Sequence, residues 1–380
     1  AMVGEEVGGA AVRAAAAGSD AGAAVALTEL LSDTEGRCSA ARVMTVLLER
    51  GEQWTAAADA GAVPSLAAML VPSGSGVGLS DGMHTAAGRT AAAECLAAIA
   101  RLEGGGVAVS DSGAMHAAIE LLEAGDSRLV VAALAIVSAA ASSSAEARAI
   151  VDKSDALRKI VTHLSGDTDE VTIAAAAALD RVSRSDAGRV DVGVAGAVRP
   201  LVDVLQAGRS PAVHAAAASA LESLALDRNN RQAIAAAGGV PALTAILASG
   251  DDGSRVAAGK VLTNLALEES TWGMMLAEGI VPLLAAMLGS GQTSAVRDAA
   301  AGAVENLALH PAAAKELALR STALPALVDL LGSGSDLGSE AAAGALENLA
   351  LHDELRAAVA AAGAVPPLVG MLGSGWGSEA

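Results

Sequence analysis

The sequence lacks phenylalanine and tyrosine and holds only three tryptophans, so aromatic residues make up 1 % of its 380 residues. It is also poor in positive charge. Lys and Arg number 24 against 43 Asp and Glu, which gives a formal net charge of −19 at pH 7. Nucleic-acid binding depends on a basic surface for phosphates and on aromatic rings for stacking bases. We therefore expect no nucleic-acid partner.

Cysteine is nearly absent as well. Cys38 and Cys95 provide neither a disulfide framework nor metal-ligand spacing, which suits the reducing environment of the cytosol or nucleus. No apolar run reaches the roughly 18 residues that a membrane-spanning helix needs, so we expect no membrane span. The sequence also lacks a phosphate-binding glycine motif, a serine nucleophile elbow and a His-Glu metal motif. We expect no catalytic residues, no metal and no cofactor.

Small and aliphatic residues take the place of aromatics. Hydrophobic residues make up 53 % of the chain, and alanine, the best helix former, is prominent among them. Such a content of apolar residues argues against disorder. A core of Ala, Leu, Val, Ile and Met must bring its backbones close together, which indicates an all-helical fold.

One short phrase recurs along the chain. It reads Gly-Ala-Val-Pro-Ser-Leu at 61–66, Gly-Gly-Val-Pro-Ala-Leu at 238–243 and Gly-Ala-Val-Pro-Pro-Leu at 363–368. From His116 onward, the position of its proline recurs every 41 to 43 residues, which is a period of helical solenoids. The first step, from Pro64 to His116, is about ten residues longer, and we assign the excess to a Gly/Ser-rich loop insertion at 71–82.

Each repeat reads as three helices. In the copy from Ala295 to Gly334, helical spacing of apolar residues predicts a long helix over 295–309. Pro311 suits the first turn of a short second helix over 311–319. Pro325 then begins a third helix over 325–331, which ends at Gly332-Ser333-Gly334.

The phrase Gly-Ala-Val-Pro-x-Leu-Val-x-x-Leu, a Gly/Ser loop and then Ala-x-x-Ala-Leu-x-Asn-Leu-Ala together resemble the armadillo repeat. The best copies are Asp298–Leu331 and Glu340–Leu372. The resemblance covers almost the whole chain in about eight units, and its style is closest to the repeats of plant U-box proteins. It implies an all-α, right-handed armadillo superhelix, in which the long helices line a concave groove.

The domain plan follows from the repeats. We expect a tail or partial helix over residues 1–20 and one armadillo domain over 21–380. The stretch 331–341 begins a long helix, and 372–380 nearly repeats it. We therefore expect the last repeat to be incomplete at 373–380 and the chain to be a fragment of a longer protein. The alternative is a natural end whose last helices pack back on the preceding repeat.

In armadillo proteins an Asn of the long helix holds the backbone of an extended peptide. The matching residues here are Asn264, Asn306 and Asn348. An amide offers both a donor and an acceptor, so these residues can bind a peptide or bond to neighbouring helices within the solenoid. Acidic residues recur beside them and suggest a strip that attracts a basic segment. These are Glu222, Glu305, Glu347, Asp298 and Glu340.

The nuclear-import type of groove also has a Trp four residues before each Asn. Lys260, Gly302 and Gly344 stand there instead, which argues against that function. The two glycines leave room for a ligand or for tight packing between long helices, and we favour packing.

The sequence thus predicts a monomeric, non-catalytic scaffold that binds a protein or peptide segment in the concave groove. The acidic residues favour a basic segment. The alternative is the substrate-recruiting armadillo domain of a plant U-box ubiquitin ligase whose U-box lies outside this chain. The chain has only four lysines, which would limit self-modification. A lipid-anchored organiser ranks lower, because Met2-Val3-Gly4 does not place Gly directly after Met.

Overall fold

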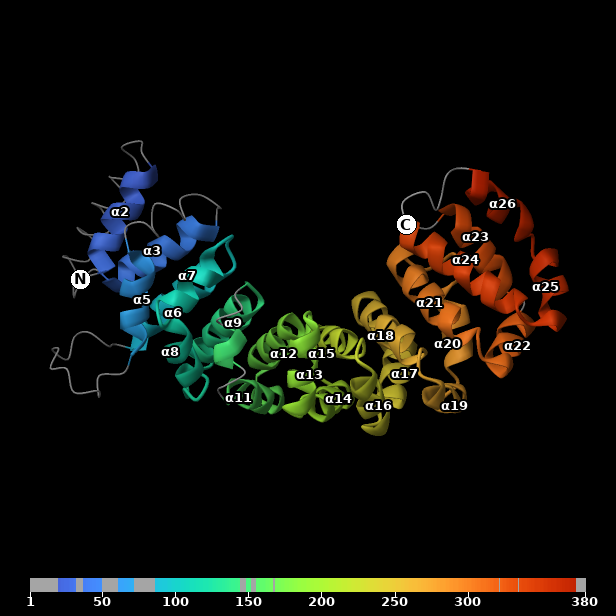
Figure 1. Cartoon of the computed structure of the whole chain (residues 1–380), viewed down its shortest axis with the longest axis horizontal. Coiled ribbons are helices and arrows are strands. Elements are labelled where there is room, and N and C mark those ends of the chain that lie inside the picture. Colours follow the sequence, from blue (N-terminus) through green and yellow to red (C-terminus); the bar gives the residue numbers. More distant parts are fainter. Residues whose placement is uncertain are drawn as a thin grey trace. The chain divides into compact units, whose positions relative to one another are not determined.

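A computed structural model describes the chain at residues 20–31, 37–49, 61–71, 86–143, 148–151, 155–166, 168–320, 322–333 and 335–373. These residues form helices and connecting turns and contain no strand. Figure 1 shows the helices following one another in chain order. The chain divides into two compact units, unit 1 (Ala1–Ala195) and unit 2 (Gly196–Ala380). The predicted all-α fold is confirmed for the described residues.

In the described part of unit 1, four long helices each pack against the next. These are α3 (Arg37–Glu49), α6 (Ala86–Ala100), α9 (Ser127–Ser143) and α12 (Asp169–Ser183). Shorter helices flank the long ones along the chain and pack beside them. These are α2 (Asp20–Leu31), α5 (Ala62–Leu70), α7 (Gly105–Asp111), α8 (Ala114–Leu121), α11 (Ala156–Thr162) with the 3₁₀ turn η1 (His163–Ser165), and α13 (Asp186–Val194).

Unit 2 repeats this arrangement more regularly. Its long helices are α15 (Pro211–Leu224), α18 (Asp252–Leu265), α21 (Ser294–Leu307) and α24 (Asp336–Ala350), and each packs against the next. The short helices that precede them are α14 (Val198–Gln206), α16 (Arg228–Ala236), α17 (Gly239–Ser249), α19 (Glu269–Ala277), α20 (Ile280–Met287), α22 (Pro311–Leu319) and α23 (Ala323–Ser333). After α24 come η2 (Asp353–Leu355), α25 (Arg356–Ala361) and α26 (Val365–Gly373).

Backbone geometry explains why the recurring phrase begins with glycine. Gly61, Gly196, Gly238, Gly279 and Gly363 all have φ between 68° and 87°, a left-handed conformation that side chains with a Cβ rarely adopt. Each of the last four glycines makes the tight turn from one short helix into the next. In all five copies the Pro of the phrase follows in the first helical turn, where its missing N–H costs no hydrogen bond. The repeat phrase is therefore a turn and a helix start.

In each unit the core lies between the stacked helices and consists of aliphatic side chains. Leu66, Leu243, Leu284 and Leu327, which hold the same position of the phrase in four repeats, are fully buried. Alanines of the long helices, such as Ala258 and Ala300, are fully buried as well, and their small side chains let neighbouring helices approach closely. Each repeat buries its apolar face on its neighbours, as in a solenoid, so no aromatic side chain has to fill a central core.

Several domain predictions fall outside the described residues. The predicted tail over 1–20 lies there except for Asp20, which begins α2. The predicted insertion at 71–82 lies there except for Val71, and the incomplete repeat at 373–380 lies there except for Gly373, the last residue of α26. Within the described residues, no single helix has both the length and the hydropathy to cross a membrane. Two pairs of consecutive helices have that length and hydropathy when taken together. These are α16 with α17, which are bent by 77°, and α19 with α20, which are bent by 85°.

Candidate functional site

The three predicted asparagines lie on successive long helices of unit 2, and each donates a hydrogen bond to the long helix before its own. Asn264 Nδ2 bonds to the carbonyl of Glu222 at 3.2 Å and Asn306 Nδ2 to that of Thr263 at 2.9 Å. Asn348 Nδ2 bonds to the carbonyl of Glu305 at 2.7 Å. The sequence left open whether these asparagines bind a peptide or bond to neighbouring helices. The structure shows the bonds to neighbouring helices.

These contacts leave part of each amide available. A primary amide has two N–H donors and one carbonyl acceptor, and each of these hydrogen bonds uses one donor. Among the described residues the three amides make no other hydrogen bond. All three side chains are half-buried. We call the surface of α18, α21 and α24 that carries them the ladder face.

Two of the predicted acidic residues are engaged by neighbours. The Glu222 carboxylate lies 3.7 Å from Lys260 Nζ on the next long helix. Asp298 Oδ2 accepts hydrogen bonds from Ser335 Oγ at 2.7 Å and Ser294 Oγ at 3.3 Å, and the same carboxylate packs against Gly338 of α24. These two residues therefore hold neighbouring repeats together and do not form an open acidic strip.

The other three acidic residues gather on α21 and α24. Burial raises the pKa of the Glu305 carboxyl, and the negative charges of Glu340 and Glu347 raise it further. Glu340 and Glu347 are exposed and lie two turns apart on one face of α24. The acidic cluster Glu305–Glu340–Glu347 is thus a patch of mutual repulsion on the ladder face.

The glycines on the long helices make room for neighbouring side chains. A Cβ on Gly344 would collide with the Glu305 carboxylate, and one on Gly302 would come within 3.4 Å of Thr263 Oγ1. Of the two roles proposed for Gly302 and Gly344, tight packing between long helices is the one that the structure shows. Lys260, at the third of these positions, pairs with Glu222.

Unit 1 has a pocket on its own long helices that the sequence analysis missed. It measures about 410 Å³ and lies among α3, α6, α9 and α12. Its floor contains Ala97, Ala98, Ala132 and Ala135, and Arg101, Arg128, Glu94 and Glu170 add charge. Arg128 donates to Glu94 at 2.8 Å. Ala98 stands where the later repeats have Asn, so the small residue at this position is the signal that could have revealed the pocket.

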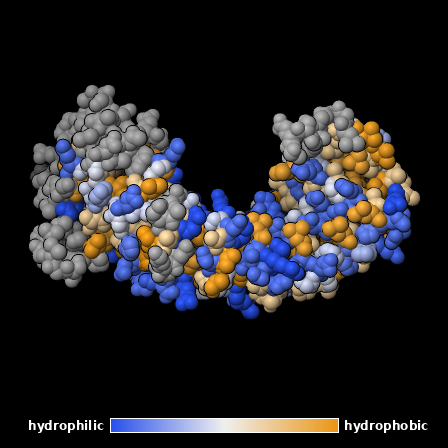
Figure 2. Space-filling model, in the orientation of Figure 1, coloured by the Kyte–Doolittle hydropathy of each residue, from blue (hydrophilic) through white to orange (hydrophobic). Residues whose placement is uncertain are grey.

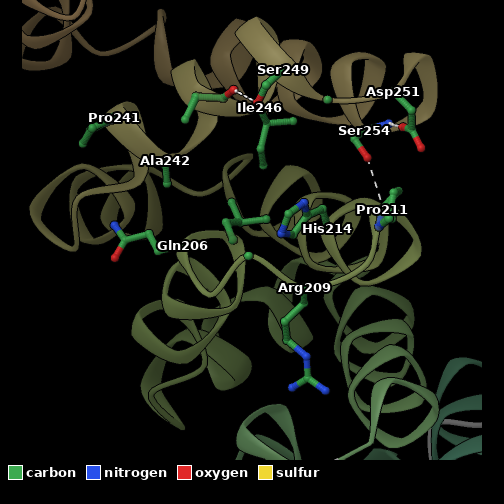
Figure 3. Close-up of a pocket in the computed structure, with 14 residues that line it drawn as sticks. Gln206, Arg209, Pro211, His214, Pro241, Ala242, Ile246, Ser249, Asp251 and Ser254 are labelled. Atoms are coloured by element: carbon green, nitrogen blue, oxygen red, sulfur yellow. Dashed lines mark hydrogen bonds between the residues drawn. The ribbon is translucent and has the colours of Figure 1, made fainter.

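A larger cavity, of about 600 Å³, lies among α14, α15, α17 and α18 of unit 2. In Figure 3, Ile246 points from α17 toward the ring of His214, and Arg209 extends away. Ser254 and Asp251 also line the cavity, but the Ser254 hydroxyl donates to the carbonyl of Pro211 at 3.3 Å. His214 Nε2 is buried without a hydrogen-bond partner. Serine, histidine and aspartate therefore do not form a hydrogen-bonded relay here.

The Cys95 thiol is fully buried on α6. Burial raises the pKa of the Cys95 thiol to about 12, so the nucleophilic thiolate is scarce at neutral pH. No three His, Cys, Asp or Glu residues in the described part are grouped to hold a metal ion. What the surfaces offer is hydrogen-bonding amides, charge and apolar pockets, which are means of binding.

Comparison with known proteins agrees with this architecture. Residues 312–351 match the Armadillo/beta-catenin-like repeat. An engineered protein with a crystal structure from the Northeast Structural Genomics Consortium, target OR497, is 29 % identical with a TM-score of 0.79, over 93 % of this chain and 85 % of that chain. A second one, target OR366, is 27 % identical with a TM-score of 0.59, over 64 % of this chain and 98 % of that chain.

The designed armadillo repeat protein YIII(Dq)4CqI is 24 % identical with a TM-score of 0.56, over 61 % of this chain and 98 % of that chain, and shows the fold alone. A search of the curated proteins returned no significant match. The fold is thus an armadillo-repeat solenoid, as the sequence predicted. Armadillo repeats generally bind protein segments and serve as scaffolds.

Proposed function

We propose that the chain is a non-catalytic scaffold that binds an extended, basic segment of a partner protein along the ladder face of unit 2. The acidic cluster carries this proposal. Glu305 is partly desolvated and repelled by Glu340 and Glu347, so its negative charge lacks compensation. An Arg or Lys side chain placed among the three carboxylates would relieve this repulsion, and the gain would weaken with salt.

The asparagines supply the complementary contacts. Asn264, Asn306 and Asn348 recur at steps of one repeat and each keep a donor and an acceptor beyond the bond to the preceding helix. An extended peptide presents N–H and C=O groups along its length, and these can pair with such amides. Recognition would then combine backbone contacts at the asparagines with charge at the acidic cluster.

The test uses a fluorescently labelled peptide of alternating Ala and Arg, with anisotropy measured at low and high ionic strength. Removing the cluster with Glu305→Gln, Glu340→Gln and Glu347→Gln should weaken binding at low salt by about tenfold or more. The matched control removes three exposed carboxylates elsewhere on unit 2, at Glu269, Glu278 and Glu354. Because both triple variants remove three negative charges, equal losses would show bulk attraction and contradict the proposal.

A narrower alternative is the substrate-recruiting domain of a plant U-box ubiquitin ligase. The scarcity of lysine favours it, and two of the four lysines, Lys159 and Lys260, are held in ion pairs with Glu123 and Glu222. The experiment is to purify the native protein from its source and to supply ubiquitin, activating enzyme and conjugating enzyme. Failure to form ubiquitin chains, with a working ligase as control, would remove this alternative.

A further inference from the structure

One position of the long helices holds a different side chain in neighbouring repeats of unit 2. It lies ten residues before the last buried leucine of each helix. The residues there are His214 on α15, Arg255 on α18, Arg297 on α21 and Ser339 on α24. The last three donate side-chain hydrogen bonds to other parts of unit 2, whereas Nε2 of His214 is buried without a partner.

Arg297 shows what a long side chain does at this position. Its Nε donates to the carbonyl of Leu288, just after α20, at 3.2 Å. Its Nη1 and Nη2 reach α23 of the next repeat, where they donate to Ser333 Oγ at 3.3 Å and to Asp329 Oδ2 at 2.6 Å. Only 10 % of the Arg297 side chain is exposed. The guanidinium group therefore fills the space between two repeats and ties them together.

The cavity of about 600 Å³ lies at the same place two repeats earlier. Each group that holds the Arg297 side chain has a counterpart there, and all of the counterparts line the cavity. Leu205 corresponds to Leu288, Ser249 to Ser333 and Ala245 to Asp329, with His214 in place of Arg297. Because imidazole is shorter than the arginine side chain and Ala245 has no carboxylate, open space replaces the ion pair.

The hydrogen-bond acceptors of this place remain. Ser249 Oγ donates to the carbonyl of Ala245 at 2.9 Å, just as Ser333 Oγ donates to that of Asp329 at 2.8 Å. The hydroxyl oxygen of Ser249 can therefore accept a further bond, as that of Ser333 does.

The negative charge that Ala245 lacks is present nearby on Asp251, which also lines the cavity. Its Oδ1 accepts from the backbone N–H of Ser254 at 2.7 Å, and hydrogen bonds from Ser254 lower the pKa of the Asp251 carboxyl. The carboxylate is thus charged at neutral pH. Arg209 extends away from the cavity in Figure 3, so its positive charge does not point into it.

The walls of the cavity combine apolar and polar side chains. In Figure 3, Ala242, Ile246 and Ser249 line it from α17, and Gln206 and His214 line it from the opposite side. On the face shown in Figure 2, hydrophobic and hydrophilic residues lie interspersed over α18 and α21. The cavity suits a ligand with an alkyl stem and a positively charged head that donates several hydrogen bonds.

We propose that this cavity binds the side chain of an arginine from a partner protein, in the place that Arg297 occupies two repeats later. The planar guanidinium group has five donors in a fixed arrangement. It would donate to the Leu205 carbonyl and to Ser249, with Asp251 balancing its charge and Ile246 packing on its stem. The cavity lies at the N-terminal ends of α15 and α18, whereas the ladder asparagines lie near the C-terminal ends of their helices. The two sites are therefore separate.

Calorimetric titration of the intact chain with small probes tests the ligand. Nα-acetyl-arginine amide should bind with a dissociation constant of about 1 mM, as suits a ligand of this size. The lysine analogue should bind at least about fivefold more weakly, because one ammonium group cannot match separated acceptors. The citrulline analogue, which has the same shape without the charge, should not bind.

Two results with these probes would overturn the proposal. Equal binding of the lysine analogue would show that the cavity does not recognise the guanidinium group. Tighter binding of free arginine than of the capped probe would identify the amino acid as the ligand, in place of a side chain on a partner protein.

Asp251→Asn tests the charge at the cavity. Asparagine also caps helices well, so α18 should remain folded while binding of the capped arginine probe weakens by about tenfold. The matched control, Asp336→Asn, removes the same charge at an exposed position in the first turn of α24 and should leave binding unchanged. Equal weakening by both variants would show general attraction to an acidic chain and contradict the proposal.

A second variant fills the cavity from within. His214→Arg combined with Ala245→Asp rebuilds the pair that Arg297 and Asp329 form. We expect this variant to have a higher melting temperature in circular dichroism and to lose binding of the arginine probe. A folded variant that binds the probe with native affinity would place the ligand elsewhere.

The acidic cluster provides the last control. The variant with Glu305→Gln, Glu340→Gln and Glu347→Gln should bind the capped arginine probe as the native chain does. Loss of binding in that variant would locate the probe on the ladder face and overturn this inference. Unchanged binding, together with failure of the Ala-Arg peptide test, would remove the ladder-face proposal and leave the cavity as the site.

Discussion

Glu305 should destabilise the folded chain at neutral pH. Burial and the charges of Glu340 and Glu347 raise its pKa in the native state, whereas in the unfolded chain the carboxyl has its ordinary value. The native state therefore binds more protons between the two pKa values, so the free energy of unfolding falls as pH rises through this window. Above the native pKa the penalty is fully present.

We therefore expect Glu305→Gln to raise the free energy of unfolding at pH 7, with a gain that shrinks as the pH falls below the ordinary carboxyl pKa. Urea denaturation at pH 7 and at about pH 4 measures both. Glu269→Gln, at an exposed position, is the control and should show no such pH dependence. A loss of stability in Glu305→Gln at pH 7 would mean that the carboxylate has a stabilising partner.

Asn306 tests the structural role of the ladder. Its side chain bridges α21 to the carbonyl of Thr263 on α18 at 2.9 Å. Asn306→Ala should lower the free energy of unfolding by about 1 kcal/mol, the usual worth of one hydrogen bond. Asn306→Asp should cost more at neutral pH, because a carboxylate has no proton to donate and would face the carbonyl oxygen.

The control for these variants is Asn229→Ala, at an exposed position of α16, with an expected change within about 0.5 kcal/mol. Equal stability of Asn306→Ala and the native chain in urea denaturation would show that the bridge contributes nothing. The asparagine would then be left with ligand binding as its role.

Sequence reasoning found the ladder asparagines but could not choose between their roles, because hydrogen bonds between repeats depend on the register of neighbouring helices. Asp298 illustrates the same limit. Its place two turns before Glu305 suggested an acidic strip, yet it accepts from Ser335 and packs on Gly338. The sequence therefore predicted where each residue lies along its helix. It did not predict which neighbours the residue contacts.

Helix α13 depends on a glycine at its third position. A Cβ on Gly188 would collide with the carbonyl oxygen of Val182 in the last turn of α12, so α13 can cross close behind α12 only with glycine there. Gly273 lies inside α19, the corresponding helix two repeats later, and a Cβ there would meet nothing within 4 Å. Gly188 and Gly273 thus lie in corresponding helices but differ in whether an added Cβ meets a neighbour.

We expect Gly188→Ala to lower the free energy of unfolding by about 1–3 kcal/mol, despite the better helix propensity of alanine. Gly273→Ala should raise it by about 0.5–1 kcal/mol, since propensity acts there alone. Thermal and urea denaturation of both variants are the measurements. Similar shifts in the two would show that close crossing does not constrain α13.

The sequence predicted the helix boundaries of the repeat from Ala295 to Gly334 to within two residues. The predicted helices over 295–309, 311–319 and 325–331 correspond to Ser294–Leu307, Pro311–Leu319 and Ala323–Ser333. Prolines and Gly/Ser loops mark helix ends locally, so the boundaries could be derived without knowing the packing. The pocket of unit 1 could not, because its residues come from four helices that only the stacking of repeats brings together.

For the molecule as a whole, the spacing of the repeated phrase determined the solenoid, because each repeat buries its apolar face on its neighbours. The chain as a whole carries an excess of negative charge. Its formal value is −19 at pH 7, and self-repulsion of this kind opposes the folded state. Several ion pairs act in the opposite direction, but those with exposed partners, such as Arg158 with Asp155 and Arg199 with Asp203, contribute little.

Added salt should therefore stabilise the protein. Raising NaCl from about 10 mM to about 300 mM shortens the screening length from about 30 Å to under 10 Å, which weakens repulsion between repeats. We expect the melting temperature in circular dichroism to rise over this range. Because salt also screens attractive pairs, a falling melting temperature would show that ion pairs between repeats, such as Lys260 with Glu222, outweigh the repulsion of the whole chain.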